Sequence, residues 1–242
     1  MRLALISDIH GNLEALEAVL RDVAGQKADQ VHCLGDVVGY GCDPVACLHL
    51  VGDSCDIKLM GNHEYAAIGV LPTGAMNPTA RQSMIWTMAQ LTDREISLIS
   101  GFEMTAEREN CLLVHASPFD PDEWHYILSP QDAVEAFAHS EHRLIFHGHT
   151  HLPVIYCRPP VGKVRTITAH DFDPDENSRY LVNIGSVGQP RDNDPRACYV
   201  IYDSSEDTVY FRRVEYDIQA AQAKMCRADM PQMLIDRLQV GR

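Results

Sequence analysis

The sequence predicts an α/β protein (α+β in some schemes) folded as a four-layer α-β-β-α sandwich of two packed mixed sheets. In residues 1–147, short apolar runs alternate with helical patterns, which is typical of a largely parallel sheet covered by helices. Residues 154–216 are mainly strand-like, which indicates a second sheet, antiparallel in part, packed against the first. The chain is 45% hydrophobic and 22% charged, so it can form a full-sized core, and we expect a single domain over residues 1–242.

The predicted strands are short apolar runs bounded by polar or turn residues. In the first half they are residues 2–7, 30–34, 56–60, 111–116 and 143–147. In the second half they are residues 154–157, 163–168, 179–184, 197–203 and 208–216. A short helical tail at about 217–238 follows the last strand, so most of the predicted helices lie between strands of the first half.

The predicted helices are recognised by their caps and by apolar residues at helical spacing. Asn12 caps the first helix, and Asp43 with Pro44 opens the second. Thr92 and Glu95 form a capping box, in which the two side chains bond to each other's backbone N–H. Beyond the helix that Asn12 caps, helices are expected over residues 43–51, 78–90, 92–100 and 130–139.

The composition excludes several classes of partner. Net charge is −14, from 34 acidic and 20 basic residues, and this disfavours a long nucleic acid, whose backbone binds through Lys and Arg. A small anionic ligand stays possible because a local cation can override the overall charge. No apolar run approaches the ~20 residues of a membrane span, so we expect no membrane partner. The eight cysteines form no C-x-x-C pair and several lie in apolar runs, which indicates free thiols and a cytoplasmic location.

Residues that commonly bind metals or carry out acid–base chemistry follow each strand of the first half. They are Asp8 and His10, Asp36, Asn62 and His63, His115, and finally His149 and His151. In open α/β sheets, binding sites form at the carboxyl ends of the strands. If these strands are neighbours, the side chains meet at one edge although they lie more than a hundred positions apart in the sequence.

Without His63, these residues offer two carboxylates, one amide oxygen and four imidazoles. Seven ligands exceed what one ion of four- to six-fold coordination needs, and they suit two ions that share a carboxylate. Mixed nitrogen and oxygen donors without a thiolate favour Mn, Fe, Zn, Co or Ni. Paired ions of this kind promote hydrolysis by stabilising both the attacking and the leaving oxygen.

The order of these motifs resembles the calcineurin-like metallophosphoesterase superfamily, and in particular its small prokaryotic phosphodiesterase and phosphatase members. The motifs are D-x-H (8–10), G-D (35–36), G-N-H-E (61–64), a strand-end His115, G-H-x-H (148–151) and NIGSVGQPR (183–191). Together they span residues 8–191. The resemblance implies the metallophosphoesterase fold and the hydrolysis of a small phosphorylated substrate.

The resemblance also implies a role for each residue. Asp8, His10 and His151 would bind one metal ion, Asn62, His115 and His149 the other, and Asp36 would bridge them, with a bridging water or hydroxide as nucleophile. His63 would be catalytic, because it would face the scissile phosphate. For the segment GSVGQPRD (185–192) two interpretations stay open: a loop near the metals in which Arg191 binds substrate phosphate, or a turn between strands. Manganese is the first expectation for both ions, with iron, zinc, nickel and cobalt as alternatives. His147, the first histidine of FHGHTH (146–151), then has no metal position left and is expected to pack.

One departure from the motifs of the superfamily narrows the range of expected substrates. Its protein phosphatases carry G-D-x-x-D-R-G, whereas Gly39 and Tyr40 stand here in place of the second Asp and the Arg. Protein phosphatase activity is therefore disfavoured, and any acidic partner of His63 must come from elsewhere. A phosphodiester or nucleotide-type substrate is the leading expectation. The alternatives are a dinucleoside polyphosphate hydrolase, a phosphomonoesterase and, more remotely, a non-catalytic scaffold of the same fold.

Overall fold

The computed structural model describes residues 1–242, apart from the side chain of residue 75. Within these residues, one mixed sheet has the strand order β11-β10-β1-β2-β3 and the other has the order β4-β5-β6-β9-β7-β8. The first contains β1 (Arg2–Ile6), β2 (Gln30–Cys33), β3 (Ile57–Lys58), β10 (Ala197–Asp203) and β11 (Thr208–Val214). The second contains β4 (Thr105–Arg108), β5 (Cys111–Val114), β6 (Leu144–His147), β7 (Val154–Arg158), β8 (Arg165–Thr168) and β9 (Arg179–Asn183).

The expectation that the two halves of the chain form separate sheets is wrong. Strands β1, β2 and β3 run parallel in the first sheet, but β5 and β6 run parallel to β9 in the second. Strand β10 returns from the end of the chain and pairs antiparallel with β1. An apolar run shows that a strand is buried, but not which strand it pairs with, because ladder hydrogen bonds join residues far apart in the sequence.

Most helices lie where the sequence predicts them. They are α1 (Leu13–Gly25), α2 (Pro44–Ser54), α3 (Asn62–Ala67), α4 (Pro78–Met88), α5 (Asp93–Ile99), α6 (Pro130–Ala138), α7 (Ile218–Arg227) and α8 (Gln232–Val240), with 3-10 turns η1 (Thr73–Ala75) and η2 (Pro121–Glu123). The Asn12 side chain caps α1, and the capping box of Thr92 and Glu95 is formed. Asp43 precedes α2 without a side-chain cap bond, and its carboxylate accepts from Lys224 of α7 instead. Helix α3 and strand β4 were not anticipated.

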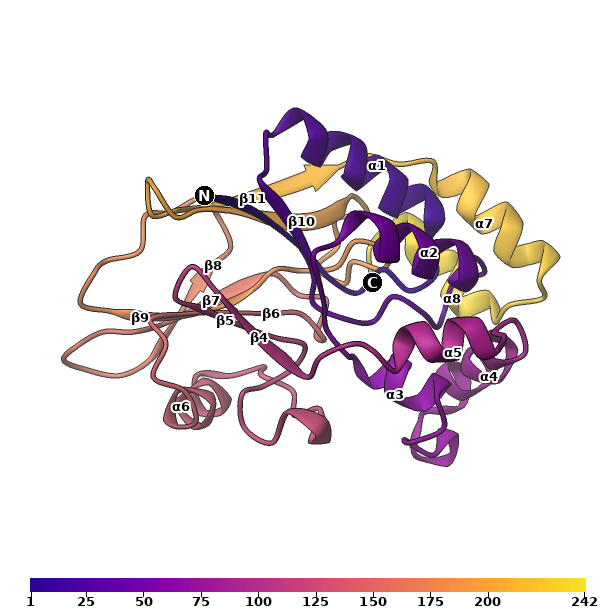
Figure 1. Ribbon diagram of the computed structural model, residues 1–242, viewed down its shortest axis with the longest axis horizontal. Helices are drawn as coiled ribbons and strands as arrows, with labels where there is room; N and C mark the ends of the chain where they lie inside the picture. Colours follow the sequence, from indigo (N-terminus) through magenta and orange to yellow (C-terminus); the bar gives the residue numbers. More distant parts are fainter.

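Apolar clusters separate four layers, as the sequence predicts. Leu5 of β1, Leu113 of β5 and Phe146 of β6 belong to the core between the two sheets. Leu16 of α1 packs in a second cluster with residues of the first sheet, and Phe137 of α6 packs with residues of the second. Figure 1 shows α1, α2 and α7 on one side of the stacked sheets and α6 on the other. The protein is therefore a four-layer α-β-β-α sandwich.

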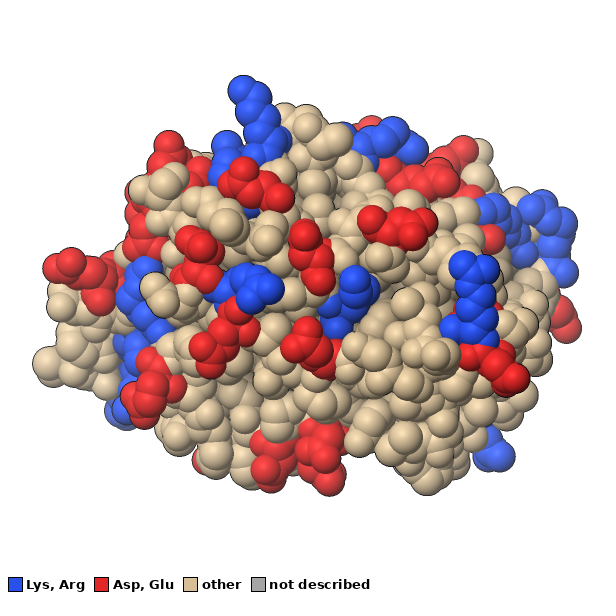
Figure 2. All heavy atoms as spheres, viewed as in Figure 1, with Lys and Arg blue, Asp and Glu red and all other residues tan. Residues whose placement is uncertain are grey.

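No helix in the described residues is both long enough and apolar enough to cross a membrane. On the face that Figure 2 shows, Lys and Arg side chains are interspersed with Asp and Glu side chains.

Candidate metal centre

The segments that follow the carboxyl ends of β1, β2 and β6 contact one another, although these strands belong to two different sheets of the sandwich. The backbone N–H of Asp8, after β1, donates to the Gly35 carbonyl after β2 over 3.0 Å. The N–H of His149, after β6 in the other sheet, donates to the Asp8 carboxylate over 3.0 Å. The predicted site residues are therefore collected from both sheets, not from neighbouring strands of one sheet.

Several site residues adopt a left-handed backbone that non-glycine residues rarely use. The φ angles are +55° at Asp8, +50° at His10, +54° at Asp36, +65° at His149 and +60° at His151. Such positions cost about 1–3 kcal/mol each and persist where the surrounding structure holds them, most often at functional sites. The tight turns end the regular alternation of the strands and aim each side chain individually.

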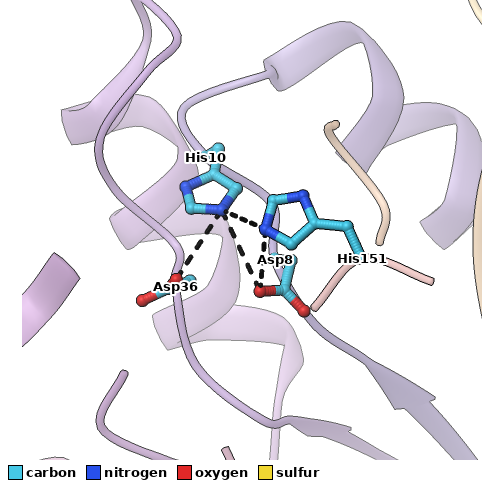
Figure 3. A group of neighbouring side chains, drawn as sticks. All are labelled: Asp8, His10, Asp36 and His151. Atoms are coloured by element: carbon cyan, nitrogen blue, oxygen red, sulfur yellow. Dashed lines mark hydrogen bonds and ion pairs between the residues drawn. The ribbon is translucent and has the colours of Figure 1, made fainter. Parts of the chain in front are cut away.

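Among the described side chains, one group able to hold a metal ion consists of Asp8, His10, Asp36 and His151, all buried (Figure 3). The His151 Nε2 atom lies 3.3 Å from Asp8 Oδ1. The His10 Nε2 atom lies 3.6 Å from Asp36 Oδ2 and 3.9 Å from Asp8 Oδ1. These nitrogen and oxygen donors therefore converge on one point.

A second group consists of Asp36, His115 and His149. The His115 Nε2 atom lies 3.4 Å from Asp36 Oδ2 and 3.2 Å from His149 Nδ1. Asp36 is thus common to both groups, and the same oxygen atom, Oδ2, faces a histidine of each. The other oxygen, Oδ1, accepts from the His63 backbone N–H over 2.9 Å, which fixes the orientation of the carboxylate.

The orientation of the histidines fits a bound cation. The Nδ1 atoms of His10, His115 and His151 face the backbone carbonyls of Val38, Leu34 and Gln189 at 3.1, 2.8 and 2.6 Å. A ring that donates from Nδ1 presents a lone pair at Nε2. Yet the Nε2 atoms of His10 and His151 lie only 3.0 Å apart. Two lone pairs at this distance repel each other unless a proton or a metal cation lies beside them.

Asn62 belongs to the same arrangement although an amide is a weaker donor. It is the first residue of α3 and lines the same cavity as Asp36 and His149. Its Oδ1 is buried without a hydrogen-bond partner in the protein. A buried polar atom normally has a partner, so an orphan oxygen beside two groups of donors fits a metal ligand.

Protonation in the site also suits a metal. Burial keeps the pKa of His10 well below its ordinary value, and it lowers the pKa of His149 to about 3. Burial opposes ionisation of Asp8 and Asp36 as well, but the neighbouring His151 and His115 hold the pKa of each carboxyl below its ordinary value. His115 is the exception among the histidines, because the adjacent Asp36 outweighs burial and raises the pKa of His115 to about 9. A metal ion at Nε2 would take the place of that proton, since transition metals bind neutral imidazoles beside ionised carboxylates.

Glu64 is a site residue that the sequence reasoning missed. It is completely buried at the third position of α3, and its carboxylate accepts the backbone N–H groups of Asp36, Val37, Val38 and Gly61 at 2.7–3.0 Å. Burial and the nearby Asp36 raise the pKa of Glu64 to about 7. Glu64 thus holds the turn that carries Asp36. Its place in G-N-H-E was the available signal.

His63 lies beside the metal groups without belonging to either. Its ring centroid is 4.7 Å from that of His10 and 4.6 Å from that of Tyr40, and its Nδ1 has no partner in the protein. In the part of the chain that the structure describes, no carboxylate accepts a hydrogen bond from this ring. Gly39, which stands where the protein phosphatases have the second Asp, brings no carboxylate, and a Cβ atom there would collide with His63 Nδ1. An Asp at this position would therefore require the His63 ring to move.

Arg191 reaches the cavity from the loop after β9. Its Nη2 donates to Gln189 Oε1 over 2.8 Å, and its guanidinium lies 5.8 Å from the Tyr40 ring centroid. Arg237 of α8, which the sequence reasoning did not consider, donates to the same Gln189 oxygen over 2.9 Å. The C-terminal helix therefore supports the loop that carries Arg191.

The remaining histidine of FHGHTH lies outside both groups. His147 is fully buried at the end of β6, with its Nδ1 3.4 Å from Asn183 Nδ2. Its Nε2 is buried without a hydrogen-bond partner in the protein, so its expected packing role stays a prediction.

A cavity of about 300 Å³ opens over the two groups. Its lining residues are Asp36, Tyr40, Asn62, His63, Leu71, Met76, Asn77, Ala80, Glu123, Trp124, Tyr126, His149, His151 and Arg191. Polar residues from both metal-type groups and an arginine thus share one small cavity with apolar and aromatic side chains. A cavity of this size accommodates a small molecule.

A family model described as the calcineurin-like phosphoesterase superfamily domain matches residues 1–207. An uncharacterised protein of Methanocaldococcus jannaschii is 34% identical, over 99% of this chain and 98% of that protein.

Solved structures show the same fold. A crystal structure of a metallophosphoesterase from Sphaerobacter thermophilus is 37% identical, covers 100% of this chain and 99% of its own, and superimposes with a TM-score of 0.86. A hypothetical protein of Pyrococcus horikoshii superimposes with a TM-score of 0.80 at 15% identity, over 100% of this chain and 98% of its own.

Proposed function

Since the chain belongs to the calcineurin-like phosphoesterase superfamily, we propose that it is a metal-dependent phosphoester hydrolase that acts on a small phosphorylated molecule. The observation that carries this proposal is the position of Asp36. One of its carboxylate oxygens lies 3.6 Å from His10 Nε2 and 3.4 Å from His115 Nε2, so a single side chain is shared by both groups of donors. That arrangement supports two ions held close together.

The proposed dinuclear site divides the donors between two ions. Asp8, His10 and His151 would hold one ion, Asn62, His115 and His149 the other, and Asp36 would contact both. Divalent transition metals suit these donors, with manganese as our first choice and iron, zinc, nickel or cobalt as alternatives. When bound, two such ions would neutralise phosphate charge and lower the pKa of a nearby water.

The protein's own residues would position and polarise the substrate. His63 lines the cavity, and from there its ring can hydrogen-bond a phosphate oxygen or the leaving oxygen. Burial lowers the pKa of His63 to about 4, so the free ring is neutral at pH 7. Arg191 would bring a fixed positive charge to the phosphate.

Charge and cavity size favour a small substrate. A net charge of −14 and interspersed surface charges (Figure 2) oppose the binding of a long polyanion. A cavity of about 300 Å³ suits one phosphodiester or nucleotide-type molecule. Dinucleoside polyphosphate hydrolysis and phosphomonoester hydrolysis are the alternatives. The free cysteines, most of them buried, fit a cytoplasmic location.

Hydrolysis of p-nitrophenyl phosphate and bis-p-nitrophenyl phosphate, assayed with Mn²⁺, Fe²⁺, Zn²⁺, Ni²⁺ and Co²⁺, tests the proposal. Asp36→Asn and His115→Ala should each lower kcat/KM by at least roughly 100-fold and lower the metal content. His170→Ala is the control, because His170 is exposed and belongs to neither group of metal-type residues. This variant should leave kcat/KM and the metal content unchanged. Full activity in Asp36→Asn would overturn the mechanism. Failure of the wild type to bind metal or hydrolyse any ester would favour a non-catalytic scaffold.

A further inference from the structure

The cavity over the metal-type groups contains residues that the proposed chemistry does not use. Leu71, Met76 and Asn77 lie between α3 and α4, and Glu123, Trp124 and Tyr126 lie between β5 and α6. We call these six residues the distal subsite. Their mixture of apolar, aromatic and polar side chains indicates which chemical group of the substrate, beyond the phosphate, would bind there.

Tyr126 presents an aromatic face next to one metal-type group. Its ring stacks on the His149 ring with centroids 4.1 Å apart and an interplanar angle of 27°. The residue nevertheless remains 54% exposed, so one ring face covers the histidine and the other is open. An open aromatic face beside a reacting phosphate can stack a planar group that is attached to it.

Trp124 adds a hydrogen-bond donor that has no partner in the protein. The residue is 8% exposed and has a left-handed backbone with φ of +57°. Its ring packs edge-on against Tyr65 and His115, with centroid distances of 5.3 and 5.9 Å. A buried indole N–H usually finds an acceptor, and a ligand in the cavity would supply one.

The polar residues of the distal subsite distinguish between possible occupants. Glu123 brings a negative charge, which would repel a second phosphate group. Asn77 accepts the Ala80 N–H with Oδ1 over 3.0 Å, so its amide N–H groups stay free to donate. A neutral planar ring with donors and acceptors at its edge can use Glu123, Asn77 and the Trp124 indole together, whereas a plain hydrocarbon ring leaves them unpaired.

We infer that the distal subsite binds the nucleobase of a nucleotide-type phosphoester, stacked on Tyr126 and bordered by Leu71 and Met76. The inference rests on the proposed function, because the base is placed relative to a phosphate held at the metal centre. It narrows the substrate to esters in which a base-bearing sugar carries the reacting phosphate.

The test compares two ligands that share one sugar phosphate and differ in the base, together with a phosphate ester of a plain hydrocarbon ring. Adenosine 5′-monophosphate, ribose 5-phosphate and benzyl phosphate compete against p-nitrophenyl phosphate turnover by the Mn²⁺-loaded enzyme. The variants are Tyr126→Leu, which removes the aromatic face, and Tyr126→Phe, which keeps it. Tyr126 is exposed, so neither variant should disturb folding.

The nucleotide should compete at least roughly tenfold better than ribose 5-phosphate in the wild type and in Tyr126→Phe, as base stacking provides. In Tyr126→Leu this ratio should fall towards one, with ribose 5-phosphate unaffected. Equal competition in the wild type, or an unchanged ratio in Tyr126→Leu, overturns the subsite. Benzyl phosphate competing as well as the nucleotide overturns the choice of a nucleobase.

The same assays distinguish failure of the distal subsite from failure of the proposed function. Hydrolysis of p-nitrophenyl esters without preference for the nucleotide contradicts the subsite alone. Absence of all hydrolysis contradicts the proposed function. In that case, calorimetric titration of the Mn²⁺-loaded protein with the same ligands applies the same criterion to the subsite.

Discussion

Replacing Glu64 with Gln should destabilise the protein and displace Asp36, although the two side chains are almost the same size. Oε1 of Glu64 accepts the N–H groups of Val37 and Val38, and Oε2 accepts those of Asp36 and Gly61. A Gln amide has one oxygen and one NH₂ group. Whichever way it is turned, its NH₂ group faces two backbone donors.

The cost follows from this count. Two buried N–H groups lose their acceptor, and each such loss costs about 1–3 kcal/mol, so the total is about 2–6 kcal/mol. Removing the negative charge relieves repulsion from Asp36, which also raises the pKa of Glu64, and this offsets part of the cost. We expect a net loss in the lower half of that range, still a large share of the ~5–15 kcal/mol by which domains are stable.

Urea unfolding at pH 8, followed by circular dichroism, measures this loss, because Glu64 is then ionised in the folded wild type. Glu95→Gln is the matched control. Glu95 occupies the same helical position in the capping box of α5, where a Gln oxygen can accept from Thr92 and the Gln NH₂ group can donate to a neutral His49 ring, now 2.8 Å from Glu95 Oε1. It should cost less than about 1 kcal/mol and leave phosphoesterase activity intact. If Glu64→Gln were as stable and as active as Glu95→Gln, Glu64 would not hold the Asp36 turn.

Three further changes test other parts of the structure. Burial lowers the pKa of His32 to about 4, so as the pH falls below 6.5 this histidine takes up a proton in the unfolded chain before it does so in the folded protein. Between pH 6.5 and 4 the wild type should therefore lose about 1 kcal/mol more stability per pH unit than His32→Leu, as measured by urea unfolding. Parallel pH profiles of the two proteins would contradict this. Arg237→Met removes one of the two donors to Gln189 and loosens the loop that carries Arg191, so KM should rise roughly threefold with kcat little changed. Arg237→Lys should recover part of this loss in KM. A change in kcat alone would show that Arg237 does not act through Arg191. Metal analysis by mass spectrometry should find two ions per chain in His147→Asn, whereas His149→Asn and His151→Asn should each bind a different one of the two ions less tightly. Loss of an ion from His147→Asn would show that this ring does bind metal.

Local patterns in the sequence identified the elements and the chemistry of the site. Asn12, Thr92 and Glu95 mark helix starts because a cap depends only on residues three positions away. Polar residues after apolar runs marked the candidate site, and the structure brings Asp8, Asp36 and their partner histidines together.

What the sequence could not show are contacts between distant residues. Strands β5 and β6 join β9 in a second sheet, and His151 reaches His10 across 141 positions. Glu64 has four backbone partners, and Tyr126 lies over His149, without any spacing rule that predicts it.

The division has a physical cause. Turns, caps and burial depend on residues within a few positions, so the order of residues along the chain determined which side chains end each strand. Which sheet a strand joins, and which side chains share a cavity, depends on how the layers pack. Packing decided that Asp36 faces histidines from both groups, that Glu64 holds its turn, and that the cavity beside them has an aromatic wall.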